Sequence, residues 1–280
     1  MSRICAITHL LLLVMLVKLM VAPLLLLFIS YAQKKFGSFI SGIIPGLPIT
    51  SGPISYFIAI EQGKLFAANS AVGALYGMSG IGLFCFVYMA VSYKCGLAKS
   101  LLIALSVWCL FSILTLFLPV NIFVACLFSI STLLALTFAT TKLKVAIDAK
   151  PLNSKWELPI KIVLVTSFIM LVTFISEHIG SAWSGLLSTF PVILAVMGSI
   201  AYISDKKDSA FKILNGGIIG SLGGCIFFAA IALLLKYDIL IWQVYTVATI
   251  SSVLFTLIFS HFINRKYVNP VAFNTAKTQL

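Results

Sequence analysis

Charged residues are scarce in this chain. Only 9% of its 280 residues are charged and 61% are hydrophobic, whereas globular domains carry about 25% charged residues. The composition therefore excludes an ordinary soluble domain and predicts an integral membrane protein that has the lipid bilayer as a partner. Acidic residues are the scarcest, at 7 against 19 Lys and Arg. Because these basic residues lie between apolar runs, we attribute their excess to membrane orientation and expect no nucleic-acid partner.

The sequence also lacks the patterns that usually support catalysis or metal binding. It has no P-loop, HExxH or GxSxG motif and no pair of carboxylates within an apolar run. Its six cysteines are scattered and none forms a CxxC pair, which argues against a metal or redox site. We therefore expect no catalytic residues, no metal, no cofactor and no enzymatic activity.

Apolar runs long enough to cross a bilayer, about 20 residues each, recur along the whole chain. The first is too long for the apolar core of a cleaved signal peptide, so we expect it to be a retained helix. We predict an all-α polytopic membrane bundle of nine transmembrane helices, over residues 5–31, 36–61, 65–93, 98–118, 120–142, 157–177, 182–204, 210–235 and 239–263.

Lys and Arg are unevenly divided between the two faces of this predicted bundle. One face would hold 15 of them, among them Lys94 and Lys99, and the other only Arg3, Lys64 and Lys236. Since Lys and Arg concentrate in cytoplasmic loops, we expect the N-terminus outside and the C-terminus in the cytoplasm.

The chain contains an internal repeat. When the sequence is shifted by 143 residues, 36–84 lies over 179–227 without a gap, and five glycine pairs and Pro48 with Pro191 coincide. A copy displaced by five spans crosses the membrane in the opposite direction, so we predict two inverted repeats of five and four helices, an arrangement typical of secondary transporters. The chain then divides into a first membrane repeat 1–143, a cytoplasmic linker 144–155, a second membrane repeat 156–266 and a cytoplasmic tail 267–280.

Proline and glycine interrupt one span in each repeat. Proline removes a backbone donor and clashes with the preceding turn, and the N-terminal end of a helix broken within the bilayer attracts anions. The alternative is a kinked helix packed among its neighbours. We predict that substrate-binding residues lie at both interruptions, namely Pro45, Gly46, Pro48, Ser51 and Gly52 in the first repeat and Ser188, Thr189 and Pro191 in the second.

Lys18 lies about 14 residues into the first predicted span. Charges within a membrane are costly and commonly functional. We therefore expect Lys18 to face the first interruption and to take part in substrate binding. Snorkelling of its ammonium to the membrane surface is the alternative.

Two glycine series share one spacing. Small residues allow helix backbones to approach closely in lipid, so we expect the third and eighth spans to cross near the axis that relates the repeats. The residues predicted to serve helix packing are Gly73, Gly77, Gly80, Gly216, Gly220 and Gly223.

A lysine near the start of one predicted helix precedes a G-L-x-x-x-F-P pattern in the next. The residues are Lys161, Gly185, Leu186, Phe190 and Pro191, matched in part by Lys18, Gly42 and Pro48. In these features, segment 161–202 resembles the small bacterial GlpM family of membrane proteins. The resemblance implies a bacterial inner-membrane protein, loosely linked to envelope polysaccharide production and without established chemistry, here built as a fused pair of such units.

Three functions stay open at this point. The repeat and its interruptions favour a secondary transporter or permease for a small solute, with anions among the candidates. The first alternative is a scaffold or accessory subunit of an envelope-synthesis complex, which would have a partner there or in a second copy of the chain. The second alternative, a membrane-embedded enzyme on lipid-linked substrates, lacks motif support. A transporter should have a solvated cavity between the repeats, whereas a scaffold should be packed there.

Overall fold

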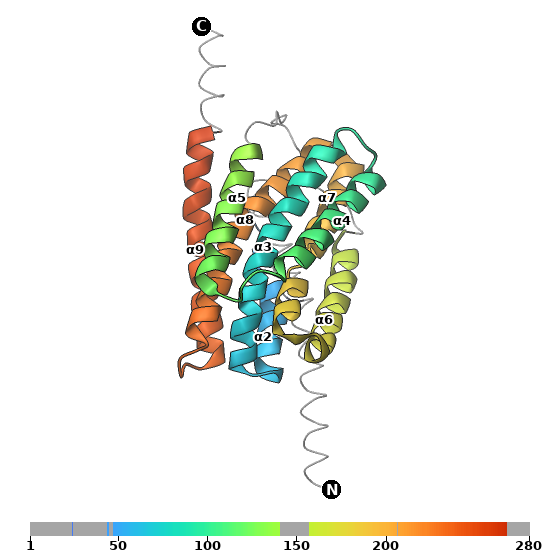
Figure 1. Cartoon of the computed structure of the whole chain (residues 1–280). Helices are drawn as coiled ribbons and strands as arrows, with labels where there is room; N and C mark the ends of the chain where they lie inside the picture. The colour runs from blue at the N-terminus through green and yellow to red at the C-terminus, as the bar shows by residue number, and fades with distance from the viewer. Residues whose placement is uncertain (1–23, 25–43, 45–46, 141–156, 206, 268–280) are drawn as a thin grey trace.

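The described part of the chain is helical, with no strand in it. The computed structural model describes residues 24, 44, 47–140, 157–205 and 207–267. The helices form an elongated bundle (Figure 1) and comprise α2 (Ser51–Glu61), α3 (Lys64–Ser92), α4 (Leu97–Thr115), α5 (Ile122–Thr140), α6 (Glu157–Ser188), α7 (Val192–Asp205), α8 (Lys207–Leu234) and α9 (Ile241–Tyr267). Nearly all of the predicted first span, the linker 144–155 and residues 268–280 of the predicted tail lie outside the described residues.

Six stretches of the described chain are long and apolar enough to cross a membrane, which makes this an integral membrane protein. They correspond to the third, fourth, fifth, seventh, eighth and ninth predicted spans. A shorter apolar stretch corresponds to the sixth, and α2 covers only the second half of the second. The six are Lys64–Ser92, Leu97–Thr115, Ile122–Thr140, His178–Ile203, Ala210–Leu234 and Ile241–Ser260, and the shorter one is Ile162–Ser176.

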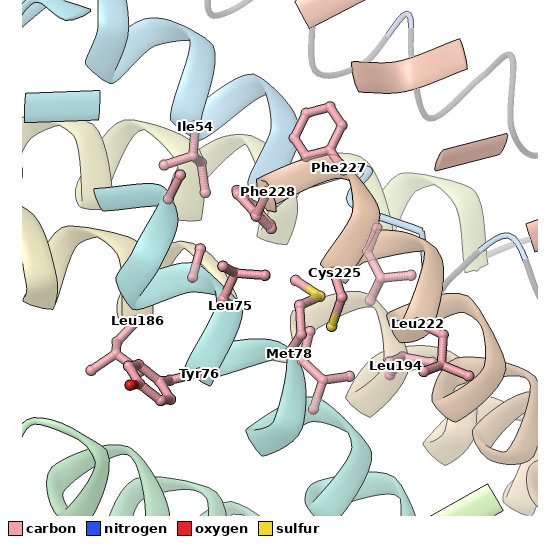
Figure 2. Close-up of a cluster of buried hydrophobic side chains, with 14 of the residues drawn as sticks. Ile54, Leu75, Tyr76, Met78, Leu186, Leu194, Leu222, Cys225, Phe227 and Phe228 are labelled. Carbon is pink, nitrogen blue, oxygen red and sulfur yellow. The ribbon is translucent and has the colours of Figure 1, made fainter. Parts of the chain in front are cut away.

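Helices α3 and α8 form the centre of the bundle and run antiparallel. Tyr93, just after α3, packs against Phe211 near the start of α8, with ring centroids 6.4 Å apart. Nearer the middle, a β-carbon at Gly224 of α8 would contact Met78 of α3. Figure 2 shows Met78 and Cys225 between the two helices. Most of both helices is buried, so this pair is the core around which the other helices pack.

Helices α4, α5 and α9 flank this pair and have two different faces. Their outer positions are large and apolar, as at Leu110, Leu127 and Leu254. Lipid tails are as apolar as leucine, so nothing drives such side chains inward, and small residues make the closest helix contacts. The inner positions are accordingly rich in small and hydroxyl residues, namely Ser100, Ala104, Ser112 and Thr115 in α4, Ala125, Ser129, Thr137 and Thr140 in α5, and Ala248, Ser252, Thr256 and Ser260 in α9.

The connections between helices follow local backbone chemistry. Between α4 and α5, the Asn121 side chain accepts a hydrogen bond from the backbone N–H of Phe123 at 2.9 Å and so caps α5. Within α6, Gly180 has φ 77° and ψ 167°, a conformation that glycine adopts readily and other residues rarely do. The chain bends there, between the predicted spans 157–177 and 182–204.

Candidate functional site

The second interruption separates the end of α6 from the start of α7. The backbone N–H of Thr189 donates to Leu186 at 3.1 Å and that of Phe190 to Leu187 at 3.0 Å, which tightens the last turn of α6. Pro191 is buried and has no N–H, so the helix cannot continue through it. Helix α7 then begins at Val192.

The two polar side chains predicted at this interruption are bonded within their own helix. The Ser188 hydroxyl donates to the Gly185 carbonyl at 2.7 Å, and the Thr189 hydroxyl donates to Leu186 at 2.6 Å. Both residues are buried, and a β-carbon at Gly77 of α3 would run into the Thr189 side chain. Their protons are therefore engaged, while their oxygens keep the capacity to accept a hydrogen bond.

The first interruption leads into α2. The backbone N–H of Gly52 donates to Pro48 at 2.8 Å, and Ser51 and Gly52 are both buried. A β-carbon at Gly52 would lie 3.4 Å from the Phe227 ring of α8. Leu47 reaches α8 as well, because its Cδ2 would lie 3.3 Å from a β-carbon at Gly223. Lys18, Pro45 and Gly46 lie outside the described residues.

The two interruptions lie at similar depth on opposite members of the central pair. The second packs on Gly77 of α3, and the first packs on Gly223 of α8. Since Gly224 lies against Met78, Gly223 and Gly77 occupy nearly the same level of the antiparallel pair. Helix α2 also packs against α6, so the interrupted segments adjoin one another.

The packing glycines contact several different helices. A β-carbon at Gly73 would meet the backbone of Ala182 in α6, and one at Gly80 would meet Trp108 of α4. One at Gly223 would meet Ser252 and Thr256 of α9. Gly216 and Gly220 are buried in α8. In α8, the glycines whose contacts reach α3 are the unpredicted Gly217, against Cys85, and Gly224.

An aromatic group beside the second interruption was missed by the sequence reasoning. Phe190 packs edge-on against Trp108 of α4, with centroids 4.9 Å apart and planes at 82°, and it packs against Phe168 of α6 at 5.3 Å. The sequence pointed to Phe190 only through the short resemblance motif. Nothing in the spacing of Phe168 and Trp108 could have linked them to it.

Several buried polar atoms around this aromatic group have no hydrogen-bond partner. In the described chain, the buried side-chain atoms without a partner are Ser79 Oγ, Trp108 Nε1, Ser112 Oγ, Thr166 Oγ1 and Asn215 Oδ1. Such groups are costly in a bilayer, where water is not available to satisfy them. This makes them candidates for contact with a ligand.

The described residues contain no group of three or more His, Cys, Asp or Glu side chains that could hold a metal ion. The assignment as a membrane protein rests on the helices of the chain itself. No protein-family model, curated protein or solved structure matches the chain.

Proposed function

We propose that the chain is an inverted-repeat membrane permease for a small solute, which passes between the repeats at the level of the two interruptions. The observation that carries this proposal is the position of the interruptions. They lie at similar depth against opposite members of an antiparallel central pair. Half-helix ends that meet near the middle of the bilayer are typical of substrate sites in secondary transporters.

The helix boundaries support the repeat. A shift of 143 residues moves Lys64, the start of α3, onto Lys207, the start of α8. The same shift moves α2 to 194–204, within α7, and moves the start of α4 to residue 240, one before α9 begins. The repeat was inferred from matched glycine and proline positions, so the helix boundaries add an independent agreement.

The contacts between α3 and α8 support the inversion. Gly224 pairs with Met78 and Gly217 with Cys85, so the pairing runs antiparallel with a constant register. Exchanging the two repeats by the shift of 143 leaves this register unchanged. An in-plane twofold axis has this property, and it would pass beside residues 79–80 of α3 and 222–223 of α8.

Helix α5 offers a reason for five helices in one repeat and four in the other. It packs against both α3 and α8. A β-carbon at Gly82 would run into Leu133 of α5, and Cys225 lies near Cys126 of α5. Gly82 and Cys225 are equivalent under the shift. A helix that covers both equivalent positions sits on the axis, so a symmetric copy would have to occupy the same space.

Thiol accessibility tests the permease. In a variant whose six cysteines are replaced by Ala, we expect Ser188→Cys to react with a membrane-impermeant methanethiosulfonate reagent. The matched control is Ser129→Cys, since Ser129 is equally buried but donates to Leu75 of α3 at 2.7 Å, on the α5 side. Equal, slow reaction at both positions would contradict the permease.

That contrary result would favour the non-transporting scaffold or accessory subunit. One observation already favours it, because the Ser188 and Thr189 hydroxyls are engaged within their own helix. The related proposals are a bacterial inner-membrane location, kinship with GlpM-like proteins, partners in an envelope complex or a second copy, and no catalytic role.

The charge distribution supports the proposed orientation. Lys64 and Asp238 form an ion pair at 3.4 Å, so the α2–α3 and α8–α9 turns share one face, which we propose is external. Reporter fusions after Lys99 should read cytoplasmic and fusions after Lys236 external. The reverse pattern would overturn the orientation.

Lys18 remains a proposed substrate-binding residue. Lys18→Met keeps the length of the side chain and removes its charge. If Lys18 binds an anionic solute, the variant should insert normally and lose uptake, whereas a snorkelling lysine should be replaceable without effect.

A further inference from the structure

Buried hydroxyl groups in this chain usually bond to a carbonyl of their own helix. Thr137 donates to Leu133 at 2.8 Å, and Ser221 donates to Gly217 at 2.8 Å. This habit removes the cost of placing a hydroxyl in lipid or in a dry core. The five buried polar atoms without a partner in the described chain are therefore exceptions that call for an explanation.

Four of these five atoms gather around Phe190. Trp108 contacts the Phe190 ring directly, and Ser112 lies one helical turn from Trp108 on the same face of α4. Ser79 precedes Gly80, where a β-carbon would touch Trp108. The fourth is Thr166, two residues before the Phe168 that packs on Phe190. The unpartnered groups thus concentrate at one place, the interruption between α6 and α7.

Trp108 is the most informative of the four. Its indole N–H can only donate a hydrogen bond, and the residue is 3% exposed. The Phe190 ring fixes the indole edge-on, and Nε1 would lie 3.1 Å from a β-carbon at Gly80. The absence of a side chain at Gly80 thus leaves the space next to an N–H that nothing accepts. A phenylalanine would make the same ring contact without this cost.

The chemistry of the group indicates the class of ligand. An indole N–H and hydroxyl groups supply donors, and α7 begins two residues after Phe190 with its N-terminal, partially positive end. Neither a charged residue nor a histidine is among these side chains. A site that offers donors without a full positive charge repays little dehydration energy. It therefore selects against sulfate and phosphate and favours monovalent, weakly hydrated anions.

We propose that a monovalent, weakly hydrated anion binds at the second interruption, held by the Trp108 indole N–H and the Ser112 hydroxyl. The site deepens the proposed permease function, since it names the solute class that the interruption would accept. Its binding can nevertheless be measured without any transport.

Iodide serves as the probe, because it belongs to this class and quenches tryptophan fluorescence. In a variant with Trp156, Trp183 and Trp242 replaced by Phe, Trp108 is the remaining tryptophan. At constant ionic strength kept with gluconate, we expect saturable quenching by iodide and competition by nitrate. Ser112→Ala should raise the half-saturating concentration about tenfold, as expected for loss of a hydrogen bond to a charge. Ser106→Ala, exposed on the same helix, should not change it.

A second variant keeps the proposal testable through stability. Trp108→Phe should leave the Tm without anion unchanged or raised, because an unpartnered donor is removed. It should also abolish the increase in Tm that nitrate causes in the unmodified chain. Quenching that is linear in iodide, or insensitive to Ser112→Ala, overturns the site, as does a nitrate effect that persists in Trp108→Phe.

Iodide flux into proteoliposomes separates this inference from the permease itself. Flux that is unchanged in Trp108→Phe overturns the anion site and leaves the permease in place. Saturable quenching without flux supports the site and overturns the permease.

Discussion

The central pair of helices and the helices around it follow opposite packing rules. In α3 and α8, nearly every face is buried, and close approach is made at glycines, as where Gly224 meets Met78. In α4, α5 and α9, only one stripe is buried, and it carries small and hydroxyl residues while the large apolar side chains point outward. The comparison teaches that apolar size marks the periphery of this protein and absence of size marks its centre.

The largest test of this comparison is a bulky residue at a central contact. A β-carbon at Gly185 of α6 would run into the backbone of Ser70 and Ala74 in α3, which cannot move aside as a side chain could. We expect Gly185→Leu to cost more than about 4 kcal/mol and to abolish recovery of monodisperse protein in mild detergent. Gly96→Leu is the control, because its surroundings are open and its φ is −67°. Equal recovery of both variants would break the comparison.

Truncation of leucine should separate the two regions next. Leu75 of α3 is fully buried, whereas Leu127 of α5 is 75% exposed. Leu75→Ala leaves a cavity and should lower the free energy of unfolding by about 2 to 5 kcal/mol. At Leu127 lipid can fill the vacated space, so Leu127→Ala should change it by less than about 0.5 kcal/mol. Unfolding titrations in mixed micelles measure both, and a larger loss at Leu127 would reverse the assignment of faces.

A smaller effect is expected where a peripheral hydroxyl bonds to the centre. Ser252 of α9 donates to the Gly223 carbonyl of α8 at 2.7 Å, whereas its neighbour Ser251 donates to Ala248 in its own helix at 3.0 Å. Ser252→Ala should cost about 0.6 to 1.7 kcal/mol, the range for interhelical bonds in membranes. Ser251→Ala should cost less in the same titration. Indistinguishable values would show that the inner stripe contributes through size alone.

The smallest effect concerns a polar contact at the membrane surface. The ion pair between Lys64 and Asp238 is exposed, and such pairs contribute little in water. We expect Asp238→Asn to leave the thermal midpoint unchanged at both low and high salt. A salt-dependent decrease would show that this contact helps to join the two halves of the chain.

Hydropathy predicted the described spans well but could not assign their faces. The eighth span was predicted over 210–235 and is observed as Lys207–Leu234, and the interruption at Pro191 falls between two helices as expected. Apolar length depends on the bilayer alone, so a single sequence reveals it. Because inner and outer faces of these helices are both largely apolar, the sequence could not reveal that Trp108 meets Phe190.

The glycines mark the same limit. Gly73, Gly77 and Gly80 were singled out by spacing, and the contacts at these positions are close ones with α6, the second interruption and α4. In α8, however, the glycines against α3 are Gly217 and Gly224. A spacing rule gives the presence of a small-residue face, whereas the partner of that face depends on the whole bundle.

The central pairing also has a consequence for biosynthesis. Helix α3 is released from the ribosome long before α8, because their starts are 143 residues apart. At about 5 to 20 residues per second, α3 waits about 7 to 30 s for its partner. During that time its glycine surface has only lipid, earlier helices or an insertion factor as a neighbour. Ribosome-bound chains that end before residue 207 should therefore be the stage at which this protein is most open to degradation.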